Sequence, residues 1–253
     1  MTVAYVFLCR SPDVSWLRRL QALEGAQDIH VVMDDNDPLP PEYAEEFPSL
    51  HFHQVPNKDM LKDAFYFDAS FIMRPEPSIT AWEKALWLHK EGLLTTAEHF
   101  WFFEDDVLVP TKTTIRRIDE SVPETADLVT ASHLSKRQDP QWFWWMYTRD
   151  MYQSLPRPRF HSMGCARRVS ARLLDEIHAF AKRQKSLAFQ EILFNTIAHN
   201  AGMSIVEAPQ LSTILWRREW KPEEFTKDHL FHPVKDMDEQ QAVWDRFMAE
   251  EHP

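Results

Sequence analysis

Three consecutive acidic residues, Glu104, Asp105 and Asp106, follow the most apolar predicted strand of the chain, residues 99–103. Neighbouring carboxylates repel one another, and burying them without a partner is costly. A divalent cation removes that cost, and hard oxygen ligands suit Mg²⁺ or Mn²⁺, which can also bridge to phosphate oxygens. The alternative is a surface turn or an acidic helix N-terminus, which is common. The strand in front of the cluster favours the metal site.

A second acidic pair, Asp34 and Asp35, follows another predicted strand, residues 29–33. Ligands of open α/β sheets bind beyond the carboxyl ends of the strands. Both acidic groups occupy this position, so the sequence predicts a ligand site at that edge of a sheet.

The elements that must position these residues alternate along the chain. Strands are predicted at residues 3–9, 29–33, 51–55, 99–103, 127–131, 203–206 and 211–216, and helices at 14–20, 77–91, 111–120, 170–184, 188–200 and 237–250. Short apolar runs indicate the strands, and apolar residues at three- and four-residue spacing indicate the helices. The alternation predicts one α/β, Rossmann-like domain over 1–253, with a mainly parallel central sheet flanked by helices.

Charge and glycine content narrow the range of functions. The net charge of -11 over 253 residues disfavours nucleic acid as a partner, because that affinity comes mainly from Lys and Arg. The four glycines are far apart, so neither a glycine-rich phosphate loop nor a dinucleotide fingerprint exists. If this protein binds a nucleoside diphosphate, a metal ion is the expected counter-charge.

The two cysteines, Cys9 and Cys165, lack the spacing of a zinc site. They fit a reducing compartment, with one disulfide as the alternative. No apolar run reaches the roughly 20 residues that cross a bilayer, so no integral membrane segment is expected. Residues 2–9 have the pattern of a buried strand and not of a signal peptide. A cytoplasmic protein is the expectation, with a peripheral membrane location or a missing anchor as the alternatives.

Residues 81–86 (Ala-Trp-Glu-Lys-Ala-Leu) and 100–107 (Phe-Trp-Phe-Phe-Glu-Asp-Asp-Val) resemble the centre of glycosyltransferases of the GT-A fold. Those enzymes carry a D-x-D motif at the end of a strand. The resemblance implies that Asp106 binds the metal directly and that Glu104 contacts the metal or the donor ribose, with Asp105 beside the donor. Glu104 stands where the family more often has Asp.

The resemblance also divides the chain into functional parts. It implies a nucleotide-sugar-binding half over residues 1–107, an acceptor-binding half over 108–236 and a terminal helix over 237–253.

Residues 230–235 (Leu-Phe-His-Pro-Val-Lys) resemble the late segment from which many GT-A enzymes supply a histidine to the same metal. This implies His232 as a ligand, with His229 as the alternative, and neutral imidazole is a suitable ligand for Mn²⁺. The competing interpretation is a structural role, which is the commoner one for a single histidine among twelve.

The first strand and its loop resemble the donor nucleoside pocket of that family. By this likeness Arg10 lies near the base, Asp34 or Asp35 lies near the base or ribose, and Lys84 approaches from a helix. The competing interpretations are a surface arginine, a capping aspartate and an exposed lysine.

The resemblance implies an enzyme whose cation, Mn²⁺ or Mg²⁺, bridges the diphosphate of a UDP- or GDP-linked sugar donor. An inverting enzyme also needs a carboxylate that deprotonates the acceptor hydroxyl. Glu191, at the start of the predicted helix 188–200, matches the usual position of that base. A first-turn glutamate stabilised by the helix dipole is the alternative.

The carbohydrate acceptor side has weaker signals. The loop 132–135 and the aromatic block 142–147 are candidates for acceptor contacts, and residues 216–218 (Trp-Arg-Arg) could add positive charge near the diphosphate. Two other functions stay open: a metal-dependent phosphoesterase or nucleotide hydrolase, and a non-catalytic carbohydrate-binding protein.

Overall fold

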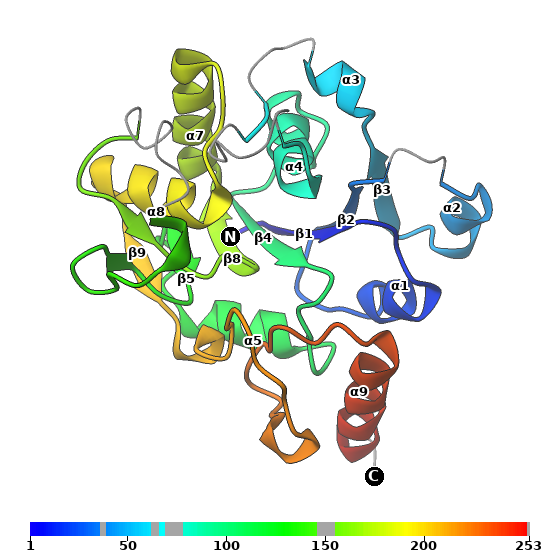
Figure 1. Cartoon of the computed structure of the whole chain (residues 1–253). Helices are drawn as coiled ribbons and strands as arrows, with labels where there is room; N and C mark the ends of the chain where they lie inside the picture. Colours follow the sequence, from blue (N-terminus) through cyan, green and yellow to red (C-terminus); the bar gives the residue numbers. More distant parts are fainter. Residues whose placement is uncertain (36–38, 62–65, 69–77, 146–154, 252–253) are drawn as a thin grey trace.

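A seven-stranded sheet with the order β3-β2-β1-β4-β8-β5-β9 forms the centre of the molecule (Figure 1). The computed structural model describes residues 1–35, 39–61, 66–68, 78–145 and 155–251. The strands of this sheet are β1 (Val3–Cys9), β2 (Asp28–Met33), β3 (Leu50–Gln54), β4 (His99–Glu104), β5 (Leu128–Thr130), β8 (Ala166–Ser170) and β9 (Ile205–Glu207). A separate small sheet pairs β6 (Leu134–Ser135) with β7 (Phe160–His161).

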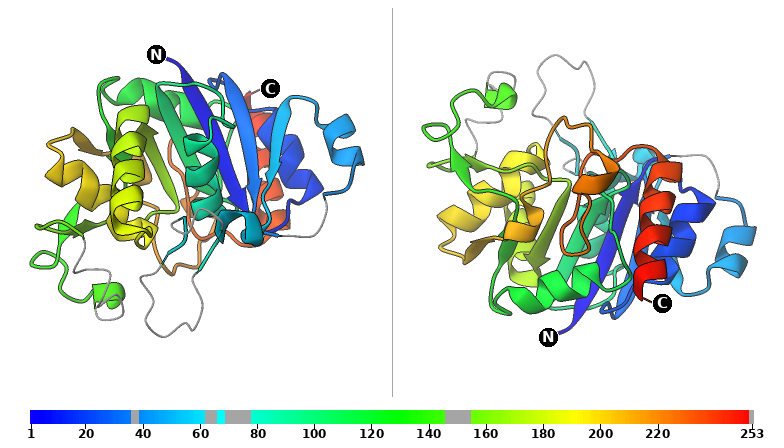
Figure 2. Two further views of the ribbon diagram at one scale, coloured as in Figure 1. Left: turned by 90° about the horizontal axis from the view of Figure 1, so that it is seen from above. Right: turned by 90° about the horizontal axis from the view of Figure 1, so that it is seen from below.

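Helices cover both faces of the large sheet (Figure 2). The α-helices are α1 (Val14–Gln21), α2 (Glu42–Glu46), α3 (Asn57–Met60), α4 (Ala81–Lys90), α5 (Thr114–Ser121), α7 (Ala171–Gln184), α8 (Gln190–Asn200) and α9 (Met237–Glu251). Helices α4, α7 and α8 lie on one face, and α1, α5 and α9 lie on the other. The predicted α/β class is therefore confirmed. Among the described residues, none of these helices combines the length and apolarity that a membrane span requires.

The pleat of β1 explains how one strand supports two cores. Ala4, Val6 and Leu8 belong to the core under α4, α7 and α8, whereas Tyr5 and Phe7 belong to the core under α1 and α5. Successive side chains of a strand point to opposite faces, so a strand buried on both faces is apolar throughout. This is why residues 3–9 form a continuous apolar run.

The sheet is parallel except at β8, which runs antiparallel to its neighbours β4 and β5. The predicted mainly parallel sheet is thus confirmed. Because β8 is reversed, its first residue, Ala166, lies opposite Phe103 near the end of β4. The chain just before β8 therefore meets the carboxyl ends of β1, β2 and β4 at one edge of the sheet.

Helix α4 begins with a capping box that also positions a tryptophan at this edge. The Thr80 hydroxyl accepts a hydrogen bond from Trp82 N at 3.2 Å, and Glu83 Oε2 accepts from Thr80 N at 2.7 Å. Such a box satisfies amide groups that a helix start otherwise leaves unpaired. It fixes the first turn of α4, and with it the Trp82 ring, over the end of β4.

Two expectations about the strands were wrong. The segment 211–216 is not a strand, because local turns take up its backbone groups: Ile214 N donates to Leu211 O, and only Ile214 forms a bridge, with His232. Strand β8 was not predicted, because Arg167 and Arg168 interrupt its apolar pattern although both are fully buried. Helix α2 lies between the predicted strands 29–33 and 51–55, where no helix was predicted.

Candidate active site

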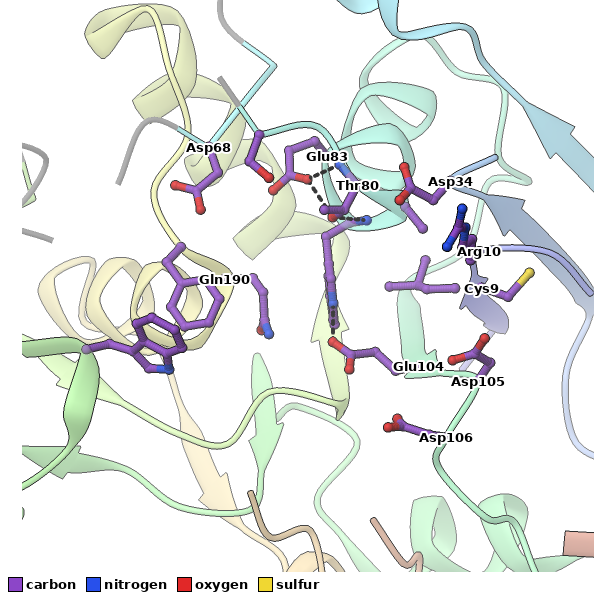
Figure 3. A pocket seen from close by; sticks show the side chains of 16 residues that line it. Cys9, Arg10, Asp34, Asp68, Thr80, Glu83, Glu104, Asp105, Asp106 and Gln190 are labelled. Atoms are coloured by element: carbon purple, nitrogen blue, oxygen red, sulfur yellow. Dashed lines mark hydrogen bonds between the residues drawn. The ribbon is translucent and has the colours of Figure 1, made fainter. Parts of the chain in front are cut away.

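The carboxyl ends of β1, β2 and β4 open into a first pocket of about 370 Å³ (Figure 3). Arg10 follows β1, Asp34 follows β2, and the acidic cluster ends β4. Six carboxylic side chains line this pocket: Asp34, Asp68, Glu83, Glu104, Asp105 and Asp106. Arg10 is the only cationic side chain among the described residues that line it. An anion therefore needs an added cation to bind here.

Within the acidic cluster, the three carboxylates have different surroundings. Glu104 Oε1 accepts a hydrogen bond from Trp82 Nε1 at 2.7 Å. Burial, together with the negative charges of Asp106 and Glu104, raises the pKa of Asp105 to about 6. The backbone of the cluster is tied to the C-terminal part of the chain, since Gln240 Nε2 donates to Asp105 O at 2.9 Å.

His232 approaches the cluster from the late segment of the chain. Its Nδ1 donates to Leu215 O at 2.6 Å, because a carbonyl can only accept, and its Nε2 lies 3.2 Å from Asp106 Oδ1. That oxygen is buried and has no hydrogen-bond partner among the residues that the structure describes. In the neutral ring, two lone pairs therefore face each other unless a proton or a cation lies between them. Burial lowers the pKa of His232, but the contact with Asp106 outweighs it and raises the pKa.

A cysteine completes this corner of the site. One ligand atom each from Glu104, Cys165 and His232 lies within 4.8 Å of the others. Cys165 directly precedes β8, and its carbonyl accepts from Glu104 N at 2.9 Å. Both cysteines, Cys9 and Cys165, are buried and free of disulfides. Burial and the nearby carboxylates raise the pKa of the Cys165 thiol well above its usual range.

Glu191 lies in the first turn of α8 and is almost completely buried. Burial and the charge of Glu104 raise its pKa to about 8, against the opposing effect of Arg167. Trp142 Nε1 donates to Glu191 Oε2 at 3.3 Å. A carboxyl group with a raised pKa in a cleft is suited to proton transfer near neutral pH.

A buried arginine fixes the residue before Glu191. Arg167 Nη2 donates to Gln190 Oε1 at 2.7 Å, and Nη1 donates to the Gln190 carbonyl at 2.9 Å. Because arginine can only donate, the amide oxygen of Gln190 must face it and the amide nitrogen faces the cleft. Gly164 makes room for this pair, since a Cβ there would lie 1.8 Å from Arg167 Nη2 and 2.0 Å from Gln190 Oε1.

A second pocket of about 520 Å³ lies on the other side of Glu191. Its lining includes four large aromatic side chains, those of Trp142, Phe143, Trp144 and Trp216. A junction of about 300 Å³ connects the two pockets and is lined by residues that include Glu104, Asp106, Cys165, Gln190, Glu191 and His232. Glu191 is the carboxylate that lines both the junction and the second pocket.

The structure brings most of the candidate residues from the sequence to this cleft. Arg10, Asp34 and the acidic cluster line the first pocket, and Glu191 and His232 line the junction. Lys84 is buried behind the pocket wall, where its Nζ donates to Asp34 O at 2.7 Å and lies 3.9 Å from Asp34 Oδ1.

Other candidates lie outside the lining. Asp35 N donates to Arg10 O at 3.0 Å, which ties the ends of β1 and β2 together. His229 contacts Thr226 Oγ1 at 3.1 Å and lines neither pocket nor the junction in the part of the chain that is described.

Some of the residues predicted for the acceptor side line the second pocket, and others do not. Ser132, Leu134 and residues 142–144 line the second pocket, and Trp216 lies at its rim. Residues 146 and 147 of the aromatic block lie outside the described residues. Arg217 stacks on Trp216, and Arg218 pairs with Glu224.

Sequence reasoning missed Cys165, Arg167 and Gln190 as site residues. Nothing local in the sequence marks them, since they come together only through the reversed strand β8. The spacing of Thr80 and Glu83 is typical of a capping box and could have predicted where α4 begins.

A family model described as "Protein of unknown function (DUF3405)" matches residues 80–250, more than half of the chain. The chain belongs to this family. The part of this DUF3405 chain that matches contains the acidic cluster, Glu191 and His232, whereas β1, β2 and β3 precede it. No curated protein matches the DUF3405 chain in sequence.

Several solved structures resemble the DUF3405 chain at low sequence identity. The galactosyltransferase LgtC, in complex with donor and acceptor sugar analogs, is 8% identical over 97% of this chain and 96% of that chain, with a TM-score of 0.48. Mouse xyloside xylosyltransferase 1, in its apo form, is 10% identical over 96% and 93%, with a TM-score of 0.44. Mannosyltransferase PcManGT from Pyrobaculum calidifontis, in complex with GDP-Man and Mn²⁺, is 14% identical over 82% and 55%, with a TM-score of 0.43.

All three of these solved structures are of glycosyltransferases. At these TM-scores the matches say nothing about the substrate or the metal of the DUF3405 chain.

Proposed function

We propose that this protein is a metal-dependent glycosyltransferase that moves a sugar from a nucleoside-diphosphate donor to a hydroxyl group of a carbohydrate acceptor. One observation carries the proposal. A carboxyl group with a raised pKa, Glu191, lies in the passage between an acid-rich pocket with a metal-suited corner and a pocket whose lining includes large aromatic side chains. A transferase needs this arrangement, because two substrates must meet at one proton acceptor.

The residues of the corner fit a divalent cation. His232 presents the lone pair of Nε2 toward Asp106 Oδ1 at 3.2 Å, and that oxygen is buried with no hydrogen-bond partner in the described part of the chain. Glu104 adds a further carboxylate, so Glu104, Asp106 and His232 would hold Mn²⁺ or Mg²⁺. A bound cation would supply Lewis-acid stabilisation of the charge that develops on the leaving diphosphate.

In this proposal the donor nucleotide occupies the first pocket. Arg10 and Asp34 flank its nucleoside end, and Lys84 holds the loop after β2 in place through its bond to Asp34 O. Asp105 lines the same pocket, and Asp35 N donates to Arg10 O at 3.0 Å, which holds the loops after β1 and β2 together. The six carboxylic side chains of the pocket exclude a diphosphate that arrives without its cation.

The acceptor occupies the second pocket, with its reactive hydroxyl toward Glu191. The aromatic side chains of its lining suit the C–H faces of a sugar ring, and Glu191 takes the proton as the hydroxyl oxygen attacks the anomeric carbon. The bond from that carbon to the diphosphate oxygen breaks, and the diphosphate leaves. Attack from the side opposite the leaving group inverts the anomeric centre, so we propose an inverting enzyme.

The two pockets support the proposed division of the chain. Apart from Trp144, Phe189 and Gln190, the residues of the first pocket come from residues 1–107. All described residues of the second pocket come from 131–216.

Calorimetry with UDP and GDP, each with and without Mn²⁺, tests the function. We expect nucleotide binding that requires Mn²⁺ and is abolished by EDTA. A nucleotide sugar incubated with the protein should remain intact until a carbohydrate acceptor is added, and NMR should show an inverted anomeric centre in the product. Hydrolysis of the donor without an acceptor at the same rate would favour a phosphoesterase. Glycan binding that ignores nucleotide and Mn²⁺ would favour a non-catalytic protein.

A further inference from the structure

Three side chains of different chemistry, those of Glu104, Cys165 and His232, come together at the proposed metal site. A carboxylate oxygen of Glu104, the Sγ of Cys165 and a ring nitrogen of His232 lie within 4.8 Å of one another, and no other such group of three exists among the described residues. Two ligand atoms of one transition-metal ion lie at most about 4.4 Å apart, since metal–sulfur and metal–oxygen bonds are about 2.3 and 2.0–2.2 Å. A small inward shift of these side chains would therefore close the group around an ion.

The surroundings leave His232 and Cys165 facing this corner. His232 is about 4% exposed, its Nδ1 donates to Leu215 O, and its Nε2 lies 3.2 Å from Asp106 Oδ1. Cys165 is about 2% exposed and lines the junction between the two pockets. The thiol therefore lies beside a carboxylate oxygen of Glu104 and a ring nitrogen of His232, and all three groups can ligate a metal ion.

We propose that Cys165 supplies a sulfur ligand to the cation of this site and thereby selects a thiophilic divalent ion over Mg²⁺. This inference rests on the proposed metal-dependent function and deepens it. Thiolate ligands favour softer ions, whereas Mg²⁺ takes oxygen ligands almost exclusively. When the ion binds, the thiol proton passes to solvent and the thiolate joins Glu104 and His232 as ligands. The expected order of affinity is Co²⁺ above Mn²⁺ and Mn²⁺ above Mg²⁺.

The other cysteine provides a matched control. Cys9 ends β1 and lines the first pocket, but it belongs to no group of metal-ligating side chains among the described residues. The chain has two cysteines, so a sulfur signal that survives the removal of Cys9 comes from Cys165.

Titration of the full chain with Co²⁺, followed by absorption spectroscopy, tests the inference. A thiolate ligand gives an intense near-ultraviolet charge-transfer band that oxygen and nitrogen ligands do not give. We expect this band in the wild-type protein and in Cys9→Ala, and its loss in Cys165→Ser. Calorimetry on the serine variant should show Co²⁺ affinity reduced about tenfold or more and Mg²⁺ affinity little changed.

The outcomes separate this inference from the function on which it rests. Co²⁺ binding without the charge-transfer band in the wild-type protein overturns the sulfur ligand but keeps a metal site. Absence of any Co²⁺, Mn²⁺ or Mg²⁺ binding in the wild-type protein overturns the metal-dependent function itself. If Cys165→Ser does not fold, the comparison of wild type with Cys9→Ala still decides, since persistence of the band assigns it to Cys165.

Discussion

Carboxylates have opposite surroundings in two regions of this molecule. Away from the cleft, Asp119 accepts from Arg168 Nη1 at 2.7 Å, and Asp127 accepts from Arg172 Nη2 at 2.6 Å. At the cleft, six carboxylic side chains line one pocket with Arg10 as its only described cationic lining residue.

The pKa shifts follow this difference. Burial acts to raise the pKa of Asp127, but its bonds to Arg172, Ser204 and Ser170 outweigh burial and lower it. At the cleft, burial and neighbouring carboxylates raise the pKa of Asp105 to about 6 and that of Glu191 to about 8. The same residue types thus stabilise the fold in one region and oppose it in the other. Acids that the fold leaves uncompensated indicate where a ligand must supply the missing charge.

The largest expected effect concerns Glu191→Gln. Loss of the proton acceptor should lower kcat by about 10²–10⁴-fold, with donor affinity kept. In the wild-type protein, turnover should rise with pH up to about 8, because Glu191 must be ionised to act. Steady-state kinetics across pH measure both effects. Undiminished transfer by the variant would remove Glu191 from the mechanism, and the exposed Glu176→Gln is the control.

The same substitution should also change how stability depends on pH. The folded pKa of Glu191 is raised to about 8, so the unfolded chain loses this proton first and stability falls as pH rises from about 4.5 to 8. Thermal unfolding should therefore show that Glu191→Gln gains stability over the wild-type protein as the pH increases through this window.

Asp106→Asn should weaken Mn²⁺-dependent nucleotide binding by at least about 100-fold, because it removes a ligand and the charge that faces His232. At alkaline pH, where His232 is neutral, the thermal stability of this variant should not fall, because the lost carboxylate stands among other carboxylates. Calorimetry with UDP or GDP and Mn²⁺ is the measurement. Unchanged affinity would exclude Asp106 from the site, and the exposed Glu124→Gln provides the matched control.

Gly164→Ala should destabilise the protein by about 3 kcal/mol, because its Cβ would overlap Arg167 and Gln190. Displacement of Gln190 should also reduce turnover. Gly202→Ala is the control: its φ of 65° disfavours alanine, but no atom lies within 4 Å, so about 1 kcal/mol is expected. Equal unfolding free energies for the two variants would contradict the tight packing at Gly164.

The smallest expected effect is a loss of stability away from the cleft, where arginines pair with the buried carboxylates. Asp127→Asn should cost about 2 kcal/mol of stability through weaker bonds to Arg172 and to Ser170 Oγ, with nucleotide binding unchanged. Chemical denaturation measures the loss. Comparison with Asp106→Asn at alkaline pH sharpens the contrast, since the same chemical change should destabilise one region and not the other. Equal stability losses would remove the distinction between the regions.

Much of the fold could be predicted because its signals are local. Continuous apolar runs marked β1, β2 and β4, and helical spacing marked α4, α7, α8 and α9. The strand predicted at 211–216 failed, because apolar composition does not show that the backbone groups close local turns. Strand β8 was not predicted, because the hydrogen-bond partners that allow Arg167 and Arg168 to be buried lie far away in the sequence.

The candidate site shows the same division. Arg10, Asp34 and the acidic cluster were found, because each follows the carboxyl end of a parallel strand and such ends meet at one edge. Their chemical roles remain proposals. Cys165 and Gln190 could not be found, since no local pattern places them beside Glu104.

By itself the sequence determined the alternation of strands and helices and the acidic group at the end of β4, since both follow from side-chain periodicity within a few residues. Only the tertiary structure decided that β8 runs backwards, and thus that a thiol and a buried arginine join those acids. It also decided that His232 points its free nitrogen at Asp106, because Leu215 takes the other one. The proximity of these side chains depends on strand direction and on contacts between distant segments, which local composition does not encode.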